Sequence, residues 1–349
     1  GISMNFDHSY FYSLATDILM TPSPSGYTQA VIEKIATYAK ELGLSAIKSN
    51  KGNLIVTFEG LDSTKVLGLS AHVDTLGLMV RSISADGTLR LTSIGGNQMM
   101  TLLGEYCTVH TRDGKAYTGT ILSLAPASHV YEDCGKKGQT VDELMVRLDE
   151  VVLSKQDVID LGIQNGDFIS IDPKTTITES GFIKSRHIDD KISVAIIFTV
   201  FKSLLEANIK PNHTIQFVVS TYEEVGHGAA SLPANITRMI AVDMGCIGKD
   251  LSCTEYDVSI CAKDSSGPYD YEMTSELIEL SKKHELGYAV DIYPFYGSDA
   301  SAALRAGHDI KAALIGPGVH ASHGVERTHI DGCVNVMKLL SAYLTEIKF

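Results

Sequence analysis

The hydrophobic pattern of the first 77 residues changes its period once. Between residues 7 and 43, apolar side chains recur every three or four positions on either side of a break at 22–26 that is rich in proline and serine. This spacing predicts two amphipathic helices. Residues 53–58 and 66–70 are instead short apolar or β-branched runs, which predict strands of a core sheet.

The stretch from residue 78 to residue 175 has a different pattern. Asp86-Gly87 and Asp113-Gly114 are typical of tight hairpins, and the residues that flank them alternate between apolar and polar. From residue 191 onward, predicted helices (191–206, 271–285, 299–306 and 330–347) alternate with predicted strands (214–220, 238–243, 257–262, 288–293 and 311–315). The pattern therefore predicts an α/β domain, residues 1–77 and 176–349, with its sheet covered on both faces and a β-rich insertion at 78–175.

The composition and the charge exclude some classes of partner. The 349 residues include 29 basic and 42 acidic side chains, a formal net charge of −13, so we expect no attraction to nucleic acid or to an anionic membrane surface. The longest apolar stretch, 194–201, is far shorter than the roughly 20 residues that a membrane-spanning helix needs. We therefore expect neither nucleic acid nor membrane as a partner.

The six cysteines are scattered and form no Cys-x-x-Cys pair, which argues against a thiolate zinc site. The first residues do not read as a secretory signal, although a mature chain from which a signal had been removed would look the same. We expect reduced thiols and a cytoplasmic location.

Side chains that can bind metal ions occur in five places, at the ends of predicted strands or just before a predicted helix. The segments are Ala71-His72-Val73-Asp74-Thr75, His187-Ile188-Asp189-Asp190-Lys191, Tyr222-Glu223-Glu224-Val225-Gly226, Val242-Asp243-Met244-Gly245, and His320 to His329 with His323 between them. Because the carboxyl ends of parallel strands converge on one crevice, residues far apart in the sequence can share one site there.

Each segment alone also fits an ordinary structural role. Asp189-Asp190 could cap a helix, and Glu223-Glu224 could begin an acidic one. Asp243 fits such a role less well, because an unpaired carboxylate at the end of an apolar strand is costly unless a cation neutralises it. The three histidines at 320–329 also exceed the average density of 12 in 349 residues.

Together and in this order, the five segments resemble the dinuclear-metal aminopeptidases of the glutamyl and deblocking type, some of which have been labelled endoglucanases. The resemblance covers nearly the whole chain, including residues 90–96 and 109–115 of the insertion. It implies a three-layer α/β/α metallopeptidase domain and a small inserted β-barrel-like domain that serves as a lid and in oligomerisation. It also implies a tetrahedral homo-oligomer of twelve subunits, a dodecamer.

The resemblance implies a set of metal ligands. His72 and His323 would each bind one of two divalent ions, Asp189 would bridge the two ions, and Glu224 and Asp243 would each complete one ligand set. Three carboxylates and two imidazoles favour zinc or cobalt over calcium or magnesium, and two neighbouring ions need carboxylates to offset their charge.

The resemblance assigns catalytic roles to two further residues. Glu223, adjacent to the ligand Glu224, would be the general base. Asp74 would hold His72 in place, because a residue two positions along an extended strand lies on the same side and its carboxylate can accept the other imidazole N–H.

Two assignments carry alternatives. The segment Gly297-Ser298-Asp299-Ala300 resembles that family's substrate-pocket loop, which implies that Ser298 and Asp299 bind substrate, but the same residues could simply cap a helix. The residues after His323 depart from the His-Ser/Thr-Pro of many family members, so His320 and His329 are alternatives to it.

These features predict a metal-dependent aminopeptidase that removes N-terminal residues from peptides, with a metal-bridging hydroxide as the nucleophile and Glu223 as the base. Three alternatives stay open. They are a carboxypeptidase or deacetylase on the same metal core, a glycoside hydrolase that uses Glu223 and Glu224, and a metal-binding scaffold without catalysis.

Overall fold

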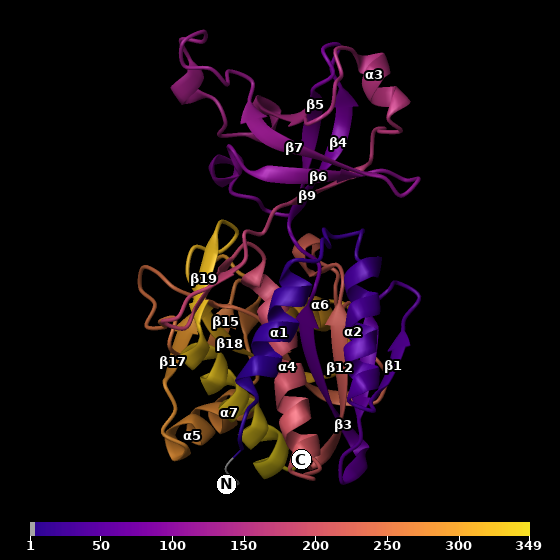
Figure 1. The fold of residues 1–349 in the computed structure, drawn as a ribbon. Helices are drawn as coiled ribbons and strands as arrows, with labels where there is room; N and C mark the ends of the chain where they lie inside the picture. The colour runs from indigo at the N-terminus through magenta and orange to yellow at the C-terminus, as the bar shows by residue number, and fades with distance from the viewer. Residues whose placement is uncertain (1–3) are drawn as a thin grey trace.

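The computed structural model describes residues 4–349, in which a small β-barrel stands on a larger α/β domain (Figure 1). No helix in this part of the chain is long and apolar enough to cross a bilayer. The predicted fold class, an α/β domain with an inserted barrel-like domain, is confirmed.

A mixed sheet forms the centre of the larger domain. Four central strands are parallel, in the order β12 (His213–Ser220), β3 (Asp62–His72), β13 (Ile236–Val242) and β18 (Lys311–Val319). On the β12 side the sheet continues through β2 (Leu54–Phe58) to β1 (Ser45–Lys48), and on the β18 side through β15 (Val258–Asp264) to β16 (Gly267–Pro268) and β17 (Tyr288–Ile292). The carboxyl ends of the four parallel strands therefore lie side by side.

Apolar residues of the central strands face two helical layers. In β13, Ile240 and Val242 belong to the main core, while Ala241 and Met239 contribute to smaller clusters beside α6 (Asp299–Arg305) on the other face. The main core also includes residues of α1 (His8–Leu19), α2 (Gln29–Glu41), α4 (Ile188–Glu206), α5 (Tyr271–Lys283) and α7 (Ile330–Glu346). This alternation confirms the prediction of a sheet covered on both faces.

The barrel is closed by six strands with their own apolar core. In order around the barrel they are β4 (Gly77–Ile83), β5 (Leu89–Ile94), β8 (Leu144–Leu148), β7 (Ala116–Ser123), β6 (Tyr106–His110) and β9 (Phe168–Ile171). The helix α3 (Lys155–Asp160) lies between β8 and β9 in the sequence. Both predicted hairpins are present, and their turn residues Gly87 and Gly114 have φ values of 87° and 86°, which glycine adopts without steric cost.

The barrel is fastened to the larger domain close to the strand ends. The buried Arg186 donates to the Glu105 carboxylate over 2.9 Å and to the carbonyl of Thr101, and Gln98 donates to the Ser322 carbonyl over 2.7 Å. A three-stranded sheet of β10 (Thr176–Ile177), β11 (Phe182–Ser185) and β19 (Glu326–His329) lies in the larger domain, and β11 leads directly to Arg186.

Substitution of Phe217 tests the main core. Phe217 in β12 is fully buried, and its ring centroid lies 5.9 Å from that of Phe198 and 6.1 Å from that of Phe201. Because Phe217→Ala leaves a cavity, we expect it to lower the free energy of unfolding by about 3–5 kcal/mol, measured by urea denaturation. Tyr271→Ala, at a ring that is 87% exposed, is the control and should change it by less than about 0.5 kcal/mol. An equal effect of the two variants would contradict the assignment of this core.

Candidate active site

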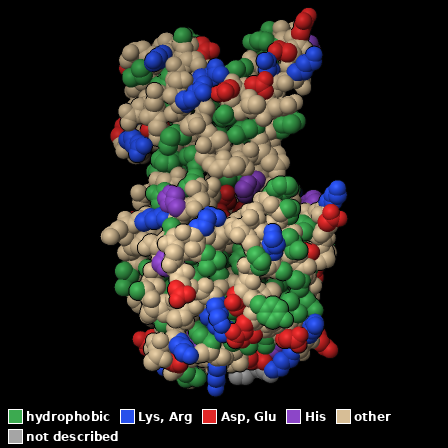
Figure 2. Space-filling model, turned by 180° about the vertical axis from the view of Figure 1, so that it is seen from behind, with side chains coloured by type: hydrophobic (Ala, Val, Ile, Leu, Met, Phe, Trp, Pro, Cys, Tyr) green, Lys and Arg blue, Asp and Glu red, His purple; other side chains and the backbone are tan. Residues whose placement is uncertain are grey.

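The predicted metal ligands gather at the carboxyl ends of the four parallel strands. His72 is the last residue of β3, Asp243 follows β13 directly, and His323 lies in the loop after β18. Glu223 and Glu224 follow β12 in the short 3-10 helix η4 (Glu223–Val225), and Asp189 lies in the first turn of α4. Figure 2, which views the molecule from behind, shows acidic and histidine side chains in the hollow between the barrel and the larger domain.

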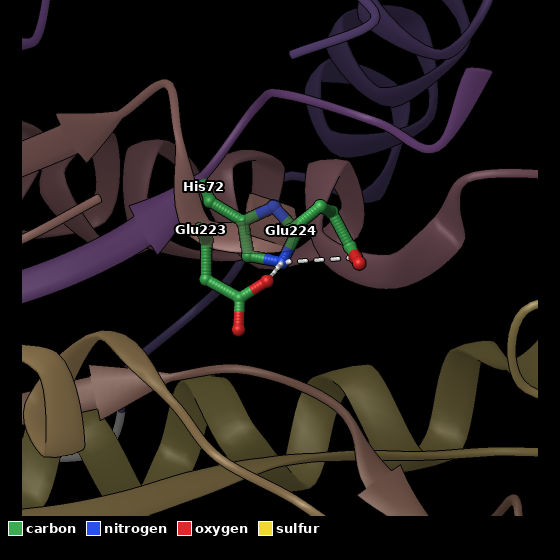
Figure 3. A group of neighbouring side chains, drawn as sticks. All are labelled: His72, Glu223 and Glu224. Carbon is green, nitrogen blue, oxygen red and sulfur yellow. Dashed lines mark ion pairs between the residues drawn. The ribbon is translucent and has the colours of Figure 1, made fainter. Parts of the chain in front are cut away.

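Four carboxylates surround one nitrogen of the fully buried His72. Its Nε2 lies 3.0 Å from Asp189 Oδ1, 3.1 Å from Glu223 Oε2, 3.6 Å from Asp243 Oδ2 and 3.8 Å from Glu224 Oε1. Figure 3 shows the carboxylates of Glu223 and Glu224 directed toward the same imidazole nitrogen. Two carboxylates that converge in this way do not flank a bond from opposite sides, which argues against the glycoside hydrolase alternative.

The second histidine of the cluster shares two of these carboxylates. His323 Nε2 lies 3.2 Å from Asp189 Oδ2 and 3.6 Å from Glu224 Oε2. Asp189 and Glu224 thus each turn one oxygen toward His72 and the other toward His323. Asp189, Glu224 and His323 form one group whose ligand atoms lie close enough to hold a metal ion, and His72 forms others with Glu223 and Glu224 or with Asp190 and Asp243.

Burial and mutual repulsion perturb the acidic groups. Loss of hydration, together with the neighbouring carboxylates, raises the pKa of Glu223 to about 8 and raises the pKa values of Glu224 and Asp243 well above their usual range. Burial alone would lower the pKa of His323, but the hydrogen bond and the charge of Asp189 outweigh it and raise the pKa to about 9. A divalent cation among these oxygen and nitrogen atoms would offset the repulsion, so the donor set fits a metal centre.

Asp74 contacts His72 through its main-chain carbonyl as well as through its carboxylate. The Nδ1 atom of His72 lies 2.9 Å from the Asp74 main-chain carbonyl and 3.4 Å from its carboxylate. The carboxylate also accepts hydrogen bonds from the backbone N–H groups of Glu223 and Glu224, both over 3.1 Å, and from the Ser25 hydroxyl. β3 ends at His72, two residues before Asp74, so the main-chain carbonyl of Asp74 also faces the imidazole.

Of the three histidines near the end of the chain, His323 alone is among the residues of the cluster. His329 caps α7 and its Nε2 lies 2.7 Å from the Ser180 carbonyl, while His320 is exposed and pairs through its backbone with Arg327. The imidazole Nδ1 of His323 lies 2.9 Å from the Gly96 carbonyl, which belongs to the barrel side of the site.

Ser298 and Asp299 line the same cavity as Glu223 and His323. This cavity has a volume of about 640 Å³. Both also have structural contacts, since Ser298 forms a capping box at the start of α6 and Asp299 accepts a hydrogen bond from Ser220 over 2.7 Å. Burial raises the pKa of Asp299 to about 6. The cap and the cavity wall are thus formed by the same residues.

Two further carboxylates of this region were given no role from the sequence. Asp190 accepts a hydrogen bond from the backbone N–H of His72 over 3.1 Å. Glu326 accepts one from Asp189 and one from His323, each over 3.0 Å. Asp190 directly follows Asp189 in the sequence, and Glu326 lies three residues after His323. This proximity to predicted ligands was the only sequence feature that indicated a role at the site.

The comparisons with known proteins agree with this geometry. A family model described as M42 glutamyl aminopeptidase matches residues 52–339. The chain belongs to this aminopeptidase family. It is 46% identical over 332 residues to the putative aminopeptidase YhfE of Bacillus subtilis, which covers 95% of this chain and 96% of that relative.

More distant relatives extend the match. The lysyl aminopeptidase of Pyrococcus furiosus is 26% identical over 347 residues, 97% of either chain. The structure of the Pyrococcus horikoshii TET1 peptidase, described as able to assemble into a tetrahedron or a large octahedral shell, has a TM-score of 0.84 at 22% identity and covers 97% of this chain and 100% of that chain. The predicted family and the prediction of an enzyme that hydrolyses peptides are therefore confirmed.

Proposed function

We propose that this aminopeptidase uses two divalent metal ions, zinc or cobalt, to hydrolyse N-terminal residues from peptides. The observation that carries the proposal is the carboxylate of Asp189, whose two oxygens lie 3.0 Å and 3.2 Å from the Nε2 atoms of His72 and His323. A carboxylate between two imidazoles in this way suits a bridge between two ions, each with its own histidine.

In this proposal each ion has one further carboxylate ligand. Asp243 lies 3.6 Å from His72 Nε2 and would be a ligand of the ion that His72 binds. Glu224 lies 3.6 Å from His323 Nε2 and would be a ligand of the ion that His323 binds. When bound, the two ions would polarise the scissile carbonyl and supply a water molecule that ionises near neutral pH.

Glu223 is the general base of the proposed mechanism. It precedes Glu224, and its carboxylate points into the cluster, 3.1 Å from His72 Nε2, where it can reach a water molecule held among the ligands. Glu223 would accept a proton from the attacking water and pass it to the leaving amine. Asp74 would orient both glutamates through their backbone N–H groups.

Ser298 and Asp299 are proposed to contact the N-terminal residue of the substrate. They line the cavity that also contains Glu223 and His323, so a side chain next to the scissile bond would reach them. Such cavities, lined by a few convergent polar groups, are typical of small-ligand sites.

The metal content tests the bridge. We expect protein dialysed against zinc or cobalt to hold about two ions per chain in elemental analysis. Asp189→Asn should lower the occupancy of both ions, because it removes the charge that they share. Asp167→Asn, at a buried carboxylate of the barrel, is the matched control and should keep both. Asp189→Asn with two tightly held ions would exclude Asp189 as the bridge.

Two neighbouring substitutions separate the base from the ligand. Glu223→Gln keeps the size of the side chain but cannot accept a proton, so we expect turnover to fall by roughly 10²–10⁴-fold with normal metal content. Glu224→Gln should weaken one metal site and recover partly in excess metal. Near-normal turnover of Glu223→Gln with both ions bound would refute the mechanism, and exchanged phenotypes would exchange the two roles.

We further propose that the chain forms a tetrahedral dodecamer. The similar TET1 peptidase, which can assemble into a tetrahedron, supports this proposal. The barrel also carries apolar side chains that are largely exposed in one chain: Tyr106, Val130, Val151 and Leu153. Light scattering at micromolar concentration should give the mass of about twelve chains. A monomer under these conditions would exclude the closed particle.

A further inference from the structure

Glu326 connects two loops of the metal centre through one carboxylate. It begins β19 and is only 2% exposed. Its Oε1 accepts a hydrogen bond from the backbone N–H of Asp189, and its Oε2 accepts one from the backbone N–H of His323, each over 3.0 Å. Each oxygen of the carboxylate is thus used by a different loop.

The two loops approach each other from separate parts of the fold. Asp189 follows β11 in the first turn of α4, whereas His323 lies between β18 and β19. Strands β11 and β19 are antiparallel neighbours, and Ser185 pairs with Glu326 in their register. Glu326 therefore lies opposite the strand that leads to Asp189, where its side chain can reach both backbones.

The loop that carries His323 depends on such external contacts. His323 and Ala321 have φ values of 65° and 59°, in the left-handed region that residues other than glycine rarely adopt. Conformations of this kind persist only where the surroundings hold them. Several contacts hold His323 from outside the loop. Glu326 accepts a hydrogen bond from its backbone N–H, the Gly96 carbonyl lies 2.9 Å from its Nδ1, and Asp189 lies 3.2 Å from its Nε2.

We propose that Glu326 is a positioning residue that fixes the distance between Asp189 and His323 and so determines how tightly their shared metal ion binds. The inference rests on the proposed function, since it assigns Glu326 to the ion that Asp189, Glu224 and His323 would hold. Residues that orient the ligands of a metal commonly change its affinity by about 10–100-fold when they are replaced.

The chemistry of the carboxylate explains why glutamate is needed at this position. Two N–H donors require two acceptor atoms, and the carboxylate supplies one oxygen to each donor. The amide of glutamine offers one oxygen, and its NH₂ group would face the second N–H. Aspartate keeps both oxygens but is shorter by one methylene, so it cannot reach both backbones in the same position.

Metal titration of the folded protein tests the proposal. The apoprotein would be titrated with cobalt, followed by calorimetry and by the cobalt absorption spectrum, for the wild type, E326Q and E326D. We expect E326Q to weaken binding of the ion that His323 holds by about 10–100-fold, because both of its positioned ligands are affected, and to weaken binding of the other ion, which shares only Asp189, less. The melting temperature of the apoprotein should be unchanged. E326D should be intermediate.

The control is E276Q. Glu276 also accepts two hydrogen bonds, from Arg238 and Tyr343, but does not contact the cluster, so E276Q should bind both ions as the wild type does. Wild-type affinity for both ions in E326Q or in E326D would overturn the proposal, and so would an equal weakening of both ions together with a lower melting temperature. If E326Q does not fold, the metal affinities of E326D decide whether the proposal holds. A wild-type protein that binds fewer than two ions would instead refute the proposed function itself.

Discussion

Electrostatic repulsion among buried carboxylates is the constraint on which this structure depends. Asp189, Glu223, Glu224 and Asp243 converge on His72 within 3.8 Å, in a place where little water screens them. Such a cluster is stable only if the scaffold holds its members and their charge is offset, by bound protons or by a cation. The four parallel strands meet the first requirement, because their carboxyl ends lie side by side in the middle of a sheet that is packed on both faces.

A second group of buried acidic side chains binds the backbone N–H groups of the residues in the cluster. The carboxylate of Asp190 accepts a hydrogen bond from the backbone N–H of His72. The carboxylate of Asp74 accepts hydrogen bonds from the backbone N–H groups of Glu223 and Glu224. The carboxylate of Glu326 accepts hydrogen bonds from those of Asp189 and His323. Hydrogen bonds from N–H groups to an ionised carboxylate are stronger than those to neutral acceptors. The arrangement gives rigidity to the backbone segments that carry the cluster.

The sequence predicts those features that depend on local pattern. The change of hydrophobic period separated the sheet domain from the barrel, and the Asp-Gly pairs located two hairpins, because in both cases neighbouring residues determine the geometry. The rule of convergent strand ends brought His72, Glu224 and Asp243 together. The contacts of Asp74 and Glu326 were not predictable in this way, because they are made to backbone groups of distant loops, and the place where β3 ends decides which atom of Asp74 faces His72.

The contacts between the barrel and the larger domain limit how the two parts can change in evolution. On the barrel side, the Gly96 carbonyl contacts the imidazole of His323, and the Gln98 side-chain amide donates to the carbonyl of Ser322. The Glu105 carboxylate of the barrel accepts a hydrogen bond from the buried Arg186. Insertions or deletions near residues 96–105 would displace contacts that hold His323 and Ser322, whereas changes on the outer surface of the barrel would leave these contacts in place. The geometry of the acidic cluster therefore constrains the length of the barrel edge that faces the larger domain, and it leaves the far side of the barrel unconstrained.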